Sequence, residues 1–284
     1  MKTSRFTRRD FLKTGLLSST AIAGMSLPGS LSIASAAPDP YRGLKMGITT
    51  YTLRKFTLDQ AITMTKEAGV KYISLKDVHL PLKSTKEQRQ EAHKKIEAAG
   101  LVLMGGGVIT IKNNDAEMQN IFDYARETGM PTIVCSPAPE ALDAVEKMAK
   151  SYDVRIAIHN HGPTDKKYPS PLDVWRMVKG RDARMGICMD VGHTVRIGED
   201  PVAVIKECSS RLYDFHMKDV NSATPSGKPV EVGKGVIDIP GVLKALLAVK
   251  FSFHVALEYE AQEDNPMPGV LGSYAYMRKV LAAK

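Results

Sequence analysis

Four short segments in the second half of the chain begin apolar and end in side chains that can bind a metal ion. They read IAIHNH (156–161), ICMDVGH (187–193), YDFHMKD (213–219) and VALEYE (255–260). The metal-type residues that they offer are His159 or His161, Asp190, His216 and Glu258. Imidazole nitrogens and carboxylate oxygens together suit a divalent ion such as Mn²⁺, Co²⁺, Zn²⁺ or Fe²⁺. The four segments therefore predict one metal site, provided that the fold brings their ends together.

The spacing of these residues indicates how the fold would do so. Successive positions from His159 to Glu258 are 31, 26 and 42 residues apart, and one strand–helix unit takes roughly 30 residues. Strand-like segments recur along the chain at 45–49, 72–75, 102–106, 132–135, 155–159, 186–190, 212–216 and 254–258. Amphipathic helical segments follow them at 57–68, 85–99, 115–128, 139–152, 171–179, 201–209, 240–249 and 269–283.

Eight alternating units predict an α/β fold, a (β/α)₈ TIM barrel. Glycine after several helices and proline in the first turn of others are the expected end signals. The C-terminal strand ends of such a barrel share one face, which would collect the four metal-type side chains. No Gly-x-Gly-x-x-Gly follows a predicted strand, which argues against a dinucleotide-binding sheet.

The first 36 residues have the features of an export signal. Arg8-Arg9 precedes a mildly apolar stretch, and Ala34-Ser35-Ala36 is typical of a cleavage site before Ala37. The paired arginines resemble a twin-arginine signal. We therefore expect residues 1–36 to be a signal peptide read by the twin-arginine export machinery. Residues 37–284 would then form one barrel in the periplasm.

Composition narrows the classes of partner. The formal net charge is +8, but beyond residue 36 there are 34 basic and 30 acidic residues, so no nucleic-acid surface is indicated. Three cysteines without framework spacing predict buried free thiols rather than disulfides. The oligomeric state stays open.

Three of the segments carry side chains with further chemical roles. Gly192 would let the chain turn so that His193 faces the same cavity as Asp190. Strand alternation places His216 and Lys218 on one face. Glu258 can bind a metal through one oxygen and accept a proton from substrate carbon through the other, which makes it the predicted general base.

These motifs resemble a known family. Asp-x-Gly-His at 190–193, His-x-Lys-Asp at 216–219 and a last strand ending in Glu258 are similar to the sugar phosphate isomerase/epimerase superfamily of xylose isomerase-like barrels. The resemblance implies a divalent metal held by Asp190, His216 and Glu258. It also implies that His193 and Lys218 bind substrate oxygens.

The chain departs from this family at the fifth strand. The epimerases end that strand with a glutamate that serves as ligand and second base, whereas this chain has His159, with His161 two residues on and on the same face. A histidine ligand is a poor second base, because its free nitrogen usually donates to a neighbouring group. The departure favours one-base chemistry, either aldose–ketose isomerisation or elimination beside a carbonyl.

Further candidates lie near the other strand ends. Lys76 and His79 follow the second strand, and Lys76 would either neutralise a developing enolate or pair with Asp77 at the rim. Tyr51 would either bind the sugar or pack in the core. The glycines at 233–235 suit a mobile cover or, alternatively, a phosphate grip.

Together these features predict an enzyme that removes a proton beside the carbonyl of a sugar. Because phosphorylated sugars are cytoplasmic, export favours an unphosphorylated keto-sugar or a 3-keto-glycoside as the substrate. Glu258 would take the proton, and Lys218 or a histidine would protonate a leaving oxygen; isomerase and lyase outcomes stay open. The alternatives are a sugar epimerase of the same superfamily and a non-catalytic sugar-binding barrel. A nuclease like endonuclease IV is disfavoured, because it needs a three-zinc cluster with more ligands.

Overall fold

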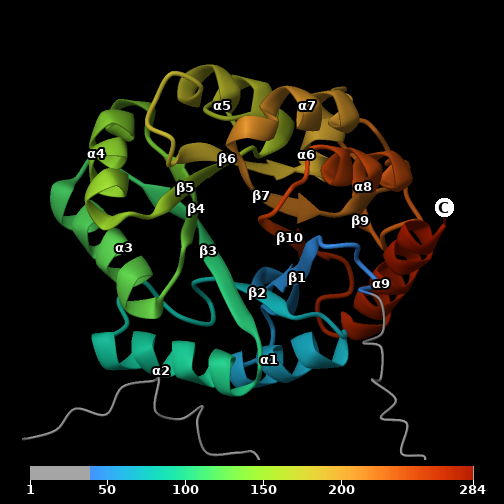
Figure 1. Ribbon diagram of the computed structural model, residues 1–284, viewed down its shortest axis with the longest axis horizontal. Coiled ribbons are helices and arrows are strands. Elements are labelled where there is room, and N and C mark those ends of the chain that lie inside the picture. Colours follow the sequence, from blue (N-terminus) through green and yellow to red (C-terminus); the bar gives the residue numbers. More distant parts are fainter. Residues whose placement is uncertain (1–38, 284) are drawn as a thin grey trace, which may run out of the picture. The chain divides into compact units, whose positions relative to one another are not determined.

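Eight parallel strands close into a barrel in the computed structural model, which describes residues 39–283 (Figure 1). The export signal expected at 1–36 lies outside these residues. Around the barrel the order is β1–β10–β7–β6–β5–β4–β3–β2, so neighbours in the chain are neighbours in the sheet. The strands are β1 (Lys45–Thr49), β2 (Tyr72–Leu75), β3 (Val102–Ile111), β4 (Thr132–Pro137), β5 (Arg155–His159), β6 (Met185–Asp190), β7 (Leu212–Met217) and β10 (His254–Leu257). The predicted TIM barrel is confirmed.

Helices form the outer layer of the barrel in Figure 1. They are α1 (Leu58–Glu67), α2 (Lys86–Ala98), α3 (Asp115–Thr128), α4 (Leu142–Tyr152), α5 (Pro171–Val178), α6 (Val191–Arg196), α7 (Pro201–Cys208), α8 (Ile239–Ala248) and α9 (Met267–Ala282). Thr57 and Thr85 start α1 and α2 with reciprocal capping boxes, and Gly129 ends α3 in the left-handed conformation. Among residues 39–283, no helix has the length and apolar character needed to cross a membrane.

Strand alternation divides the buried residues into two groups. On β5, Ile156 and Ile158 belong to the large apolar core shared with the helices, whereas Ala157 belongs to a separate small cluster with Val134 and Cys188. On β7, Phe215 likewise joins the large core. Since adjacent strand residues point to opposite faces, the barrel interior receives small or polar side chains. This division puts most of the apolar packing between the strands and the helices, so the barrel interior can hold side chains that take part in a reaction.

Two parts of the chain differ from the sequence-based expectation. The third strand was expected to end at residue 106, but β3 continues through the glycines at 105–107 to Ile111. A Cβ on Gly107 would lie 1.9 Å from the Val134 carbonyl oxygen, so the glycine permits close contact between β3 and β4. Helix α6 and the hairpin of β8 (Asp219–Val220) and β9 (Pro229–Val230) were not predicted, because both are shorter than the patterns used to recognise them.

The loop at 231–237 is tied to the barrel through Asp219. The carboxylate of Asp219 is fully buried and accepts backbone N–H groups from Val220, Gly233, Gly235 and Ile237 at 2.9–3.1 Å. The cavity described below has no lining residue from this loop. The contacts indicate an anchored loop rather than the mobile cover or phosphate grip expected from its glycines.

Replacing Asp219 with asparagine should therefore destabilise the barrel. Asparagine loses the charge and turns an NH₂ group toward N–H donors, which leaves buried donors without acceptors. We expect Asp219→Asn to lower the free energy of unfolding by about 2–4 kcal/mol in urea titrations. Glu67→Gln, at an exposed position on α1, is the control and should change it little. Equal stability of the two variants would refute the anchoring role.

Candidate active site at the barrel mouth

Four buried side chains meet at the C-terminal ends of adjacent strands. They are His159 on β5, Asp190 on β6, His216 on β7 and Glu258 just after β10, and one ligand-type atom from each lies within 4.8 Å of the others. His216 Nδ1 is central, 3.1 Å from His159 Nε2 and 3.3 Å from Glu258 Oε2. Asp190 Oδ2 lies 3.7 Å from His159 Nε2. The predicted meeting of the four segments therefore occurs.

This donor set fits a divalent metal ion. Two imidazole nitrogens and two carboxylate oxygens are suitable ligands for Mn²⁺, Co²⁺ or Zn²⁺. The two oxygens of the Asp190 carboxylate face different groups. Oδ1 accepts the backbone N–H of His193 at the start of α6, while Oδ2 faces the cluster. Oδ2 is buried and faces positively charged or ligand-type groups, with the Lys218 ammonium 2.8 Å away and His159 Nε2 3.7 Å away.

Lys218 brings a positive charge to the same place. Its buried ammonium lies 2.8 Å from Asp190 Oδ2 and 2.7 Å from Glu258 Oε2, and it also contacts Glu260. Its side chain passes over α6, where a Cβ on Gly192 would lie 2.6 Å from Lys218 Cδ. The glycine of the Asp-x-Gly-His motif was expected to make a sharp turn. Instead it is helical and makes room for Lys218, so the two motifs depend on each other.

Burial and these charges set the protonation states. Burial lowers the pKa of His159 to about 4 and that of His193 to about 3, so both are neutral near pH 7. For His216, burial acts in the same direction, but Glu258, Asp214 and Asp190 outweigh it and raise the pKa to about 9. Burial would raise the pKa of Glu258, but Lys218 and His216 outweigh it and hold the pKa well below its usual range. Glu258 is therefore ionised.

The geometry distinguishes the two histidines that the sequence left as alternatives. His159 is 1% exposed and belongs to the four-residue cluster, whereas His161 is exposed at the mouth, with Nδ1 3.8 Å from Asp165 Oδ2. Asn160 between them is fully buried; it accepts the Asp190 N–H at 2.8 Å and reaches Thr194. Asn160 thereby fixes the ends of β5 and β6 relative to each other, a role that sequence reasoning missed.

A polar cavity of about 420 Å³ opens above the cluster. Its lining comes from two halves of the barrel. Strands β1 to β4 and the turns after them supply Tyr51, Lys76, Val108, Thr110 and Ser136; the other half supplies His159, His161, Asp165, His193, Glu258 and Glu260. The structure thus places four of the predicted substrate-binding residues in the cavity wall, namely Tyr51, Lys76, His161 and His193.

Two of these side chains also make rim contacts. Lys76 Nζ donates to the Val108 carbonyl at 3.1 Å and lies 3.3 Å from Asp77, and the Arg54 guanidinium stacks over Tyr51. Lys76 therefore forms the predicted ion pair with Asp77 and also lines the cavity, while its role toward an enolate stays a prediction. Thr110 and Ser136 were missed because the predicted third and fourth strands were too short. Carrying the strand alternation two residues further would have found Ser136.

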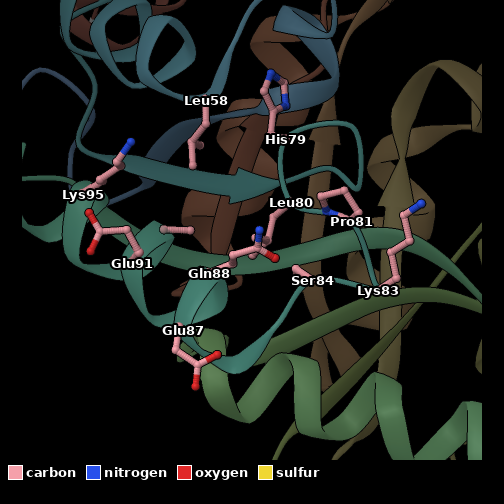
Figure 2. A pocket seen from close by; sticks show the side chains of 11 residues that line it. Leu58, His79, Leu80, Pro81, Lys83, Ser84, Glu87, Gln88, Glu91 and Lys95 are labelled. Atoms are coloured by element: carbon pink, nitrogen blue, oxygen red, sulfur yellow. The ribbon is translucent and has the colours of Figure 1, made fainter.

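His79 was predicted to bind substrate, and the structure places it elsewhere. It lines a separate pocket of about 630 Å³ between the loop after β2 and helices α1 and α2, as Figure 2 shows. The Glu91 and Lys95 side chains of α2 line the same pocket. This pocket is larger than the mouth cavity but contains none of the four cluster residues. We therefore assign the chemistry to the mouth cavity. The prediction that His79 binds substrate there is wrong, because the chain turns away from the barrel mouth after Lys76.

Comparison with known proteins agrees with this architecture. Residues 62–280 match the family described as xylose isomerase-like TIM barrel, and the chain belongs to that family. It is 29% identical to the rhizopine catabolism protein MocC of Rhizobium meliloti over 43% of this chain and 41% of that protein. It is 26% identical to an inosose dehydratase of Geobacillus thermodenitrificans, over 49% of this chain and 52% of the relative. The matches thus span about half the length of these two curated relatives.

A solved structure shows the same fold over the whole barrel. The 3-keto-D-glucoside 4-epimerase of E. coli superposes with a TM-score of 0.68 at 15% identity, covering 83% of this chain and 99% of the other. The family match and the superposition together show a xylose isomerase-like TIM barrel.

Proposed function

We propose that this protein is a divalent-metal-dependent enzyme that removes a proton from the carbon beside the carbonyl of an unphosphorylated keto-sugar or 3-keto-glycoside. The observation that carries the proposal is the position of Glu258. Its carboxylate belongs to the ligand cluster and also lines the cavity, and Lys218 lies 2.7 Å from it. One side chain can thus bind the metal and face the substrate carbon.

The chain supplies the remaining requirements of this chemistry. A divalent metal held by His159, Asp190, His216 and Glu258 would act as a Lewis acid on the substrate carbonyl. Glu258 is ionised and would accept the proton through its free oxygen. Burial opposes a charge on Lys218, but Asp190, Glu258 and Glu260 outweigh it and raise the pKa well above its usual range. Lys218 would therefore stabilise developing negative charge rather than donate a proton.

Protonation of a leaving oxygen then falls to another group. His193 has a lowered pKa and is a weak candidate, whereas His161 lies at the cavity mouth beside Asp165. In a lyase reaction, the bond from the neighbouring carbon to the glycosidic oxygen would break, and His161 would supply that oxygen with its proton. In an isomerase reaction, the proton would move from Glu258 to the former carbonyl carbon, and the neighbouring hydroxyl would pass its proton to the former carbonyl oxygen.

Two arguments narrow the substrate and the outcome. The predicted export signal favours an unphosphorylated sugar in the periplasm, and the structural relative named as a 3-keto-D-glucoside epimerase supports a keto-glycoside. His159 stands where the family's epimerases have a second base, and its pKa of about 4 keeps it available as a neutral ligand. This argues against two-base epimerisation, which is the alternative within the same family.

Solvent exchange tests the proposal directly. Purified protein with Mn²⁺ and a 3-keto-glucoside in D₂O should incorporate deuterium at the carbon beside the carbonyl, detected by proton NMR. A lyase would also release the aglycone, and an isomerase would not. Metal-independent binding of the sugar without any exchange would instead indicate the non-catalytic sugar-binding barrel.

A further inference from the structure

A buried carboxylate lies directly behind one of the four cluster residues. Asp214, two residues before His216 on β7, is 0% exposed, and its Oδ1 is 3.7 Å from His216 Nε2. This separation is that of an ion pair rather than a hydrogen bond. The Cys188 thiol donates to the same oxygen, and Oδ2 lies 3.7 Å from His254 Nδ1. Asp214 is therefore enclosed by two imidazoles and a thiol inside the barrel.

The strand register explains this arrangement. Asp214 pairs with His254 on β10 and with Cys188 on β6, while His216 pairs with Ala256 and Asp190 one layer closer to the mouth. Alternation points Asp214 and His216 into the interior together. The carboxylate thus lies beneath the cluster, on the side away from the cavity.

The two nitrogens of His216 face different groups. Nδ1 points at His159 and Glu258, whereas Nε2 points at Asp214. When a metal displaces the Nδ1 proton of His216, a carboxylate beside Nε2 favours a proton there over a lone pair, and so favours the tautomer that offers Nδ1 as a ligand. The other cluster imidazole has no such support, since His159 Nδ1 has no hydrogen-bond partner in the described chain.

We propose that Asp214 is a positioning residue that holds the His216 ring with its Nε2 proton directed into the barrel and its Nδ1 presented to the metal. The inference rests on the proposed metal site. His254 lies on the far side of the same carboxylate, with its Nδ1 3.7 Å from Asp214 Oδ2. Asp214 touches neither the cavity nor the substrate, so its effect acts through His216.

Zinc binding by purified variants tests this role without any substrate. Asp214→Asn keeps the shape of the side chain and removes the charge. We expect its affinity for Zn²⁺, measured by calorimetry, to fall by about 10–100-fold, the usual effect of removing the partner of a metal-bound histidine. Asp219→Asn is the matched control, because it also neutralises a buried aspartate. The Asp219 carboxylate, just after β7, contacts backbone amides rather than His216. It should bind Zn²⁺ as the unmodified protein does.

NMR of the ring nitrogens gives a readout that lost stability alone would not change. In the unmodified protein with Zn²⁺, His216 should carry its proton on Nε2, and that proton resonance should move upfield in Asp214→Asn. If Asp214→Asn does not fold, the tautomer of the unmodified protein with bound Zn²⁺ decides the matter, and a proton on Nδ1 with Nε2 unprotonated overturns the inference.

The outcomes separate this inference from the proposed function. Zn²⁺ binding by Asp214→Asn at the strength of the unmodified protein, with an unchanged resonance, overturns the positioning role and leaves the metal site intact. Failure of the unmodified protein to bind Zn²⁺ overturns the metal site, and the role of Asp214 falls with it. Weaker binding in Asp214→Asn with normal binding in Asp219→Asn supports the inference.

Discussion

Glu258→Gln should lower the turnover of a 3-keto-glycoside by about 10²–10⁴-fold, the usual contribution of a general base. Glutamine keeps the shape of the side chain and an oxygen that can still bind a metal, but it cannot accept the proton. The effect should fall on kcat rather than on KM, because the missing interaction forms only as the C–H bond breaks. Initial rates at saturating Mn²⁺, with the metal content of the protein measured alongside, would separate lost chemistry from lost metal.

Glu260→Gln is the matched comparison. Glu260 lines the same cavity and contacts the same Lys218 ammonium, but it is not part of the four-residue cluster. Its replacement should cause a far smaller loss of turnover. If Glu258→Gln retains near-normal turnover, or if the two variants lose activity equally, Glu258 is not the base.

Removal of divalent metal should abolish turnover, and addition of Mn²⁺, Co²⁺ or Zn²⁺ should restore it. The cluster offers two imidazoles and two carboxylates in a buried site, where a bound divalent metal would polarise the substrate carbonyl. Dialysis against a chelator, with residual metal measured by atomic spectroscopy, is the direct experiment. The metal that restores the highest rate would identify the ion the ligands leave open.

Thermal unfolding provides a second measure of the same prediction. Metal that binds only the folded protein stabilises it by about 2.7 kcal/mol at a concentration 100 times its Kd. The midpoint should therefore rise with added metal and fail to rise in Asp190→Asn, which loses a ligand charge. Full turnover by protein shown to be free of metal would contradict the proposed mechanism.

The sequence was sufficient for the barrel and for the four strand ends that meet at its mouth. Asp190, His216 and Glu258 follow apolar runs at intervals of one strand–helix unit, and parallel strands bring their C-terminal ends to one face. That inference needs only local alternation and spacing. It could not choose between His159 and His161, because both lie on one face of an ideal strand. The choice depends on Asn160, whose side chain accepts the Asp190 N–H and so holds the end of β5 against the end of β6.

Other features depend on contacts between distant segments and leave no local signal. Asp214 resembles any polar residue in a strand until the register places it between His216 and His254. Gly192 looks like a turn residue until the Lys218 side chain is seen to pass over it. His79 follows a strand in the same way as the true site residues, but the loop takes it to the outer pocket. Such contacts are set by packing rather than by spacing.

The cavity wall has one consequence for how this protein could diversify. The four ligand-type residues come from the contiguous strands β5, β6, β7 and β10, whereas Val108, Thr110 and Ser136 belong to the opposite half of the barrel. The ligand-type residues thus lie in the second half of the chain, while both halves contribute to the cavity wall. If the proposed function holds, mutations in β3 and β4 would alter the shape of the cavity, and so the substrate that fits it, without changing any of the four ligand-type residues.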